Sequence, residues 1–155
     1  MRGDIALFLG LVTVIGGGVF AAIFLLVGSD GAGSNACANP LLPIGESDIS
    51  QKGFQTEDVG MGRVFQAASA SNLEAANDAF YGNNSEIHNF THNIDAGLRD
   101  VDEELAIDLC ESVITLEEAL YAEQPDLALI ASQAARARAL LRDAAEALGY
   151  ARPGE

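Results

Sequence analysis

The sequence predicts an all-α membrane-anchored protein: one N-terminal transmembrane helix, a flexible stalk, and an antiparallel four-helix bundle stapled by one disulfide. Three observations predict this architecture. Residues 5–27 form an apolar run that contains no charged side chain. From Thr56 onward, apolar residues recur at spacings of three and four, and no stretch alternates like a β-strand. The chain contains two cysteines, Cys37 and Cys110, an even number that can pair.

The apolar run of residues 5–27 is long enough to cross a bilayer. At about 1.5 Å per helical residue it reaches roughly 34 Å, against a hydrocarbon core of about 30 Å. Arg2 precedes the run and no base follows it until Lys52, so the positive-inside rule places residues 1–4 in the cytoplasm and the rest of the chain outside the cell membrane. A cleaved signal peptide is the alternative, because residues 34–36 fit a signal peptidase site. The apolar core of a signal peptide, however, usually has only about 7–15 residues.

Small residues lie four apart on this predicted helix. Gly17 pairs in this way with Ala21, and Gly18 with Ala22. Such pairs let two transmembrane helices approach closely. We therefore expect the span to pack against a second one, either from another copy of the chain in a homo-oligomer or from a larger transmembrane protein.

The composition is strongly acidic, with 23 acidic residues against 8 basic ones and a formal net charge of -15. This charge repels phosphate backbones, so nucleic acid is excluded as an expected partner. Without the anchor about 125 residues remain, which is the size of one domain. Arg136, Arg138 and Arg142 make the last predicted helix locally basic, and we expect them to pair with acids of the helix predicted over residues 102–118.

Residues 28–55 are rich in Gly, Ser, Asn and Pro and are predicted to form the stalk. Its Leu41, Leu42 and Ile44 are expected to pack onto the domain. Outside the cell membrane a pair of cysteines usually forms a disulfide, and a Cys37–Cys110 bond would close a loop of about 74 residues. It would stabilise the fold by roughly 4 kcal/mol in the chain-entropy model. Two free thiols are the alternative.

The bundle is predicted over residues 56–150, with residues 151–155 as a tail. Short loops between the predicted helices force neighbouring helices to run antiparallel. The first arm is expected to be broken at Ser71, which forms a capping box with Glu74. The residues expected to face the core are Val59, Val64, Phe65 and Ala68, then Ile87, Phe90, Ile94 and Leu98, then Leu105, Leu109, Val113, Leu116 and Leu120, and finally Leu127, Ile130, Ala134, Ala137, Leu141, Ala144 and Leu148.

The residues that can carry chemistry lie on the helix predicted over residues 86–98. His88 and His92, the two histidines of the chain, are four apart, and Asp95 follows three residues later on the same face. Two imidazoles and a carboxylate form a ligand set suited to a divalent metal such as Zn, Fe or Cu. Glu86 or an acid from the next helix can add another oxygen.

A structural role for these residues is the competing interpretation. Polar residues beside a core stripe commonly bond to a neighbouring helix. The next helix offers acids that can pair with protonated histidines, namely Asp102, Glu103, Glu104, Asp108 and Glu111. A ferritin-like centre would require a second helix with a Glu-x-x-His motif, which this chain lacks.

No catalytic motif accompanies the predicted domain. It contains no Gly-x-Ser-x-Gly elbow and no glycine-rich phosphate loop leading into a helix. We therefore expect a non-enzymatic, single-pass, extracytoplasmic or periplasmic domain that acts as an accessory or interaction subunit of a membrane complex. The alternative is an extracytoplasmic metal-binding domain that uses His88, His92 and Asp95 to hold or deliver Fe, Cu or Zn.

Overall fold

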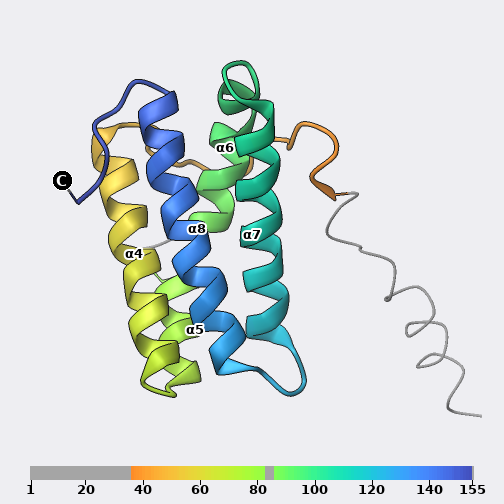
Figure 1. Ribbon diagram of the computed structural model, residues 1–155, viewed down its shortest axis with the longest axis vertical. Coiled ribbons are helices and arrows are strands. Elements are labelled where there is room, and N and C mark those ends of the chain that lie inside the picture. Colours follow the sequence, from red (N-terminus) through yellow and green to blue (C-terminus); the bar gives the residue numbers. More distant parts are fainter. Residues whose placement is uncertain (1–35, 83–85, 155) are drawn as a thin grey trace, which may run out of the picture. The chain divides into compact units, whose positions relative to one another are not determined.

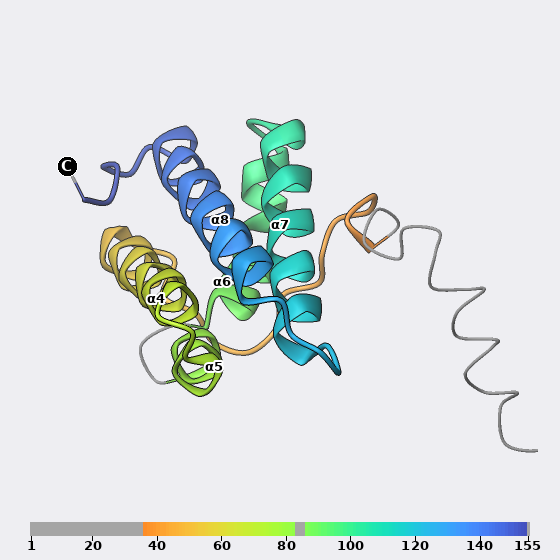
Figure 2. The ribbon, with the colours of Figure 1, turned by 60° about the horizontal axis from the view of Figure 1, so that its bottom comes forward.

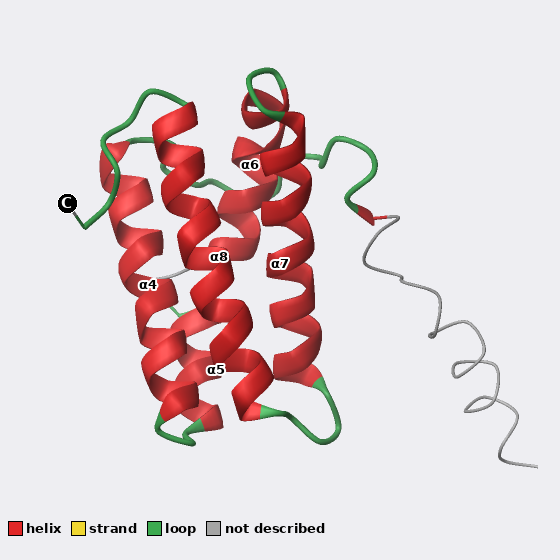
Figure 3. Ribbon diagram, viewed as in Figure 1, coloured by secondary structure: helices red, strands yellow, loops and turns green. Residues whose placement is uncertain are grey.

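The computed structural model describes residues 36–82 and 86–154, which form a helical bundle (Figure 1). Helices and loops make up this described part of the chain, and it contains no strand (Figure 3). The prediction of an all-helical bundle is confirmed for these residues. The helices are α4 (Gln51–Ser69), α5 (Leu73–Tyr81), α6 (Ile87–Arg99), α7 (Glu103–Tyr121) and α8 (Leu127–Ala147).

The predictions for the N-terminal part fall outside the described residues. They concern the cytoplasmic residues 1–4, the transmembrane helix over residues 5–27 with its small-residue pairs, and the stalk before residue 36. Among the helices within residues 36–82 and 86–154, none combines the length and the apolarity needed to cross a membrane.

Helix α8 lies between α4 and α7, while α5 packs along α4 and α6 packs along α7 (Figures 1 and 2). α4 and α7 run in the opposite direction to α8 (Figure 1). Apolar side chains from all five helices meet in one core. The largest fully buried ones include Phe54, Met61, Phe80, Ile87, Leu98, Leu109, Leu116, Ile130 and Leu141.

The predicted core stripes of α6, α7 and α8 are buried in the structure, apart from Leu105, Leu127 and Leu148, which are half-buried. The stripe of α4 is predicted only in part, since Val64 and Ala68 are buried as expected but the other two residues are not. Val59 and Phe65 are 50% and 41% exposed, and Phe54 and Met61 fill the core instead. The buried face of α4 also carries polar residues, including Asp58, which hide its apolar periodicity.

α4 begins at Gln51, inside the predicted stalk and earlier than the expected Thr56. Ser50 caps it, because its hydroxyl oxygen accepts a hydrogen bond from the Gly53 amide over 3.2 Å. A side chain at residue 53 would overlap the carbonyl oxygen of Asp48. The close approach of the Asp48 backbone therefore requires glycine at this position, although the composition of residues 28–55 favoured a flexible segment.

The helix break expected near Ser71 is present, since α4 ends at Ser69 and α5 begins at Leu73. The two helices do not continue one arm, however, because the chain reverses between them and α5 packs against α4. Ser71 has a φ of 57°, and its amide donates to the Ala68 carbonyl while the Asn72 amide donates to the Ala67 carbonyl. This pattern is a Schellman motif, which ends a helix. Asn72, rather than Ser71, caps α5, and its side chain accepts from the Ala75 amide over 3.0 Å. α5 then packs beside α4.

An ion cluster joins α4 to α8. The Asp58 carboxylate is buried and accepts from Arg138 Nε over 3.0 Å and from Arg142 Nε over 2.6 Å. Burial alone would raise the pKa of Asp58, but the hydrogen bonds and charges of the two guanidinium groups outweigh it and hold the pKa below 3.8. The expectation that all three arginines of α8 pair with α7 is therefore wrong. Arg136 does so, 3.6 Å from Asp108.

Candidate functional site

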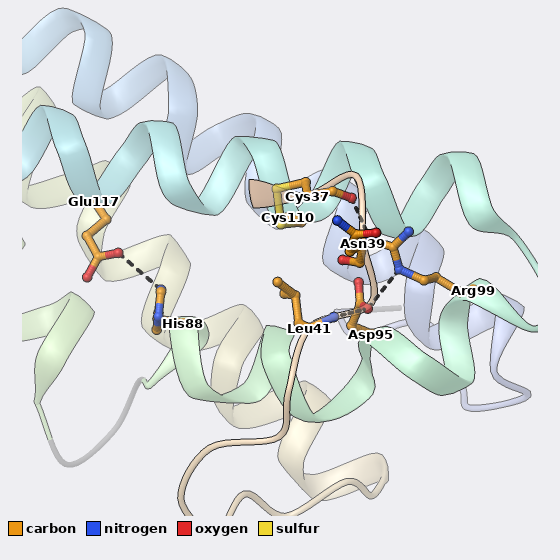
Figure 4. Close-up of a disulfide and its surroundings, with 8 residues drawn as sticks. All are labelled: Cys37, Asn39, Leu41, His88, Asp95, Arg99, Cys110 and Glu117. Atoms are coloured by element: carbon orange, nitrogen blue, oxygen red, sulfur yellow. Dashed lines mark hydrogen bonds and ion pairs between the residues drawn. A yellow bond between two sulfur atoms is a disulfide. The ribbon is translucent and has the colours of Figure 1, made fainter. Parts of the chain in front are cut away.

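The segment before α4 is bonded covalently to the bundle. Cys37 and Cys110, the latter in α7, form a disulfide with an S–S distance of 2.03 Å and a Cα–Cα distance of 5.8 Å (Figure 4). The predicted disulfide is confirmed, and both cysteines are buried. Residues 37–44, called the strap below, then run along α6, to which their backbone is hydrogen-bonded.

Asp95 and Arg99 of α6 hold the first half of the strap. Arg99 Nε lies 2.8 Å from Asp95 Oδ2, and the side chains are 8% and 1% exposed. Arg99 Nη2 donates to the carbonyls of Cys37 and Asn39 over 2.6 and 3.2 Å. Asp95 Oδ2 also accepts from the Leu41 amide over 2.8 Å (Figure 4). Both members of the buried ion pair therefore also bind the strap backbone.

His92 and Asn93 hold the second half of the strap. Asn93 accepts from the Ile44 amide and donates to the Ile44 carbonyl, both over 3.0 Å. His92 Nδ1 lies 2.9 Å from the Leu42 carbonyl oxygen and donates to it. The strap thus docks through its backbone. The expectation that its apolar side chains pack on the domain is wrong for Leu42, which is 80% exposed, while Leu41 and Ile44 are half-buried.

His88 faces α7 rather than the strap. Its Nδ1 lies 3.1 Å from Glu117 Oε2, and the Tyr81 hydroxyl donates to Glu117 Oε1 over 2.6 Å. Burial lowers the pKa of His88 below 6.5; the Glu117 charge opposes this shift, and His92 adds to it. A carboxylate oxygen can only accept, so His88 Nδ1 donates to Glu117. Burial, followed by the hydrogen bond to Glu117, raises the pKa of Tyr81.

The three predicted metal ligands thus have separate partners. The rings of His88 and His92 lie 4.7 Å apart, but His92 binds the strap, and Asp95 binds Arg99 and Leu41. Figure 4 shows His88 and Asp95 pointing toward different partners. Within residues 36–82 and 86–154, no three or more His, Cys, Asp or Glu side chains are grouped so that they can hold a metal ion. Metal binding stays a prediction.

Sequence reasoning missed the roles of Arg99, Asn93 and Glu117. The pairing of Arg99 with Asp95 had a signal, since the two residues are four apart on a helix. Asn93 had none, because its partner is backbone. An acid from the next helix was expected near the histidines, but the acid is Glu117 rather than any of the five predicted acids.

Comparison with known proteins gives no family for this architecture: the chain matches no protein-family model, no curated protein and no solved structure.

Proposed function

We propose that this chain is a non-catalytic, single-pass membrane protein whose extracytoplasmic helical domain serves as an accessory or interaction subunit of a membrane complex. The observation that supports this most is the docked strap. The segment that would lead from the membrane is bonded to α7 through Cys37 and Cys110 and hydrogen-bonded along α6.

The strap makes the tether short. Ala36 follows Val27 by nine positions, so a fully extended chain would separate them by about 30 Å at most. Since Cys37 is bonded to the bundle, the strap cannot lengthen this reach by detaching from α6. A domain that only needed to be held somewhere near the membrane would require no such attachment. A fixed, short distance is useful when the domain must meet a neighbour in the same membrane.

The disulfide also supports the extracytoplasmic location, because such bonds persist in oxidising compartments and are rare in the cytosol. The acidic composition is compatible with an aqueous domain that keeps clear of anionic lipid surfaces.

The anchor and its orientation are tested in cells. The full chain should stay in the membrane after an alkaline carbonate wash. In intact cells or spheroplasts, a thiol reagent that cannot cross the cell membrane should label a Gln124→Cys variant, since Gln124 is exposed in the loop before α8, but not a Gly3→Cys variant. Release by carbonate, or labelling at residue 3, would contradict the proposal.

The interaction role is tested by placing a photo-cross-linking amino acid at exposed positions around the bundle in otherwise unchanged chains. Val59, Val101 and Leu129 are exposed and lie on α4, on the connection between α6 and α7, and on α8. We expect one defined membrane-protein adduct that forms from some positions and not from others. A chain that stays monomeric and without adducts at every position would refute the role.

Metal binding is a second candidate, supported by the 4.7 Å separation of the two imidazole rings. It predicts stoichiometric metal in the purified full chain and none in the His88→Ala/His92→Ala variant. Since His92 and Asp95 hold the strap, a metal on them would also speed hydrogen exchange of the Leu41 amide. Protein that stays metal-free after incubation with Fe, Cu and Zn would exclude this candidate.

A further inference from the structure

Two tyrosines are exposed beside each other on α5 and α7. Tyr121 is 67% exposed and Tyr81 is 41% exposed, and their ring centroids are 5.4 Å apart. Glu117 lies one helical turn before Tyr121, accepts from Tyr81 and also contacts His88. These four residues are called the tyrosine face below. Exposed tyrosines next to a carboxylate combine aromatic surface with negative charge.

A small hollow lies at the edge of the tyrosine face. It has a volume of about 100 Å³ and is lined by Phe80, Tyr81, Glu86, His88 and Asn89. This volume is enough for the charged head of one side chain. Its lining includes aromatic rings and one exposed carboxylate, Glu86, and cations bind well over aromatic rings in such surroundings.

The charge around the tyrosine face is negative and uncompensated within the elements that form it. α5 and α7 contain no Lys or Arg. The single base of α6, Arg99, is held by Asp95 at the other end of that helix. Glu117 itself bonds to the Tyr81 hydroxyl and the His88 ring rather than to a Lys or Arg.

We propose that the tyrosine face is the docking site for a basic segment of a partner protein, with an Arg or Lys side chain stacked on Tyr121 and its charge directed at Glu117. Charge complementarity identifies the occupant, because exposed aromatic rings beside a carboxylate, on helices that contain no Lys or Arg, attract a cation. Tyrosine is also enriched at binding hot spots. This inference rests on the proposed interaction role and names the chemistry of its partner.

The test uses the full chain in an uncharged maltoside detergent, because a phosphocholine detergent would itself supply a cation. The probe is the peptide acetyl-Gly-Arg-Gly-Arg-Gly-amide, with glutamine replacing both arginines in the control peptide. The readout is the ring proton NMR signals of His88 and His92, the two histidines of the chain. We expect a saturable shift of the His88 signal with the arginine peptide and none with the glutamine peptide.

Matched variants separate a site from a general attraction to an acidic protein. Tyr121→Ala and Glu117→Gln should each weaken binding roughly tenfold. Glu104→Gln removes the same charge at the opposite, exposed end of α7 and should change binding less than twofold. Equal weakening by Glu117→Gln and Glu104→Gln, or a shift that does not saturate, would overturn the proposal.

Two further outcomes would overturn this inference and leave the interaction role intact. Adducts that form from Val59, Val101 or Leu129 but not from residue 121 would move the partner to another face. Self-association that Tyr121→Ala abolishes without any peptide would make a second copy the occupant. Loss of all adducts, by contrast, would remove the proposed function itself.

Discussion

Replacing Asp95 by asparagine tests whether the α6 ion pair holds the strap and stabilises the fold. The substitution keeps the shape of the side chain and removes its charge. Arg99, whose side chain is 8% exposed, would then keep a buried charge without its counterion. The carbonyls of Cys37 and Asn39 would still accept from its guanidinium. Both positions open to the new amide nitrogen are unfavourable. In place of Asp95 Oδ1, which is buried without a hydrogen-bond partner, the nitrogen would have no acceptor. In place of Oδ2 it would meet the Leu41 amide and Arg99 Nε, which are themselves donors.

The magnitude follows from the geometry. Arg99 Nε and Asp95 Oδ2 are 2.8 Å apart, so their gross attraction at an effective dielectric constant of about 20 is about 6 kcal/mol. Removing one partner of a buried pair usually costs about 3–5 kcal/mol, because the other charge is left uncompensated. The retained carbonyl contacts favour the lower end of that range. We expect the free energy of unfolding to fall by about 3 kcal/mol.

The assay is urea unfolding of the full chain in maltoside at pH 7, followed by circular dichroism at the helical band. Asp108→Asn is the matched control, because Asp108 lies 3.6 Å from Arg136 with both side chains about half exposed. The control should lose less than about 1 kcal/mol. Similar losses in the two variants, or a loss below about 1 kcal/mol in Asp95→Asn, would refute the assigned role of the buried pair.

Three other changes have outcomes that the structure determines. The Cys37→Ala/Cys110→Ala variant should lose about 4 kcal/mol of unfolding free energy in urea, because the closed loop spans 73 positions; an unchanged urea midpoint would contradict this. Gly53→Ala should lower the free energy of unfolding by about 2 kcal/mol, since the new methyl group overlaps the Asp48 carbonyl oxygen. A stabilised variant would show that the backbone at Asp48 moves aside easily. The Asp58 pKa is lowered in the folded state, so its stabilisation is present above pH 3.8 and is lost as the pH falls through the folded pKa. In acid titrations followed by circular dichroism, Asp58→Asn should therefore show a shallower loss of stability than the unchanged chain, and parallel curves would contradict the assignment.

The helices were predictable wherever one face is purely apolar. The residues Ile87, Phe90, Ile94 and Leu98 of α6 repeat at helical spacing and are all buried. The core face of α4 was predicted only in part, because it mixes Phe54 and Met61 with charged and glycine residues. A hydrophobic pattern cannot reveal a buried face that includes a carboxylate such as Asp58, whose arginine partners lie 80 and 84 positions away in the sequence.

The disulfide was predictable for a different reason. Two cysteines permit one pairing within the chain, so counting them and inferring the compartment was enough. The turn at Ser71 was missed because serine commonly caps helices, whereas here it takes the left-handed conformation that usually favours glycine.

The partners of the polar residues on α6 could not be predicted from residue types alone. His92 and Asp95 at helical spacing fit a metal ion as well as they fit a structural partner, because both need lone pairs or ring nitrogens on one face. Their partner in the structure is the backbone of the strap, and every residue except proline offers the same amide and carbonyl groups. The side chains of a segment that binds through its backbone therefore do not indicate where it binds. The docking of the strap can be inferred only from the disulfide between Cys37 and Cys110, because this bond restricts the residues after Cys37 to the neighbourhood of α6.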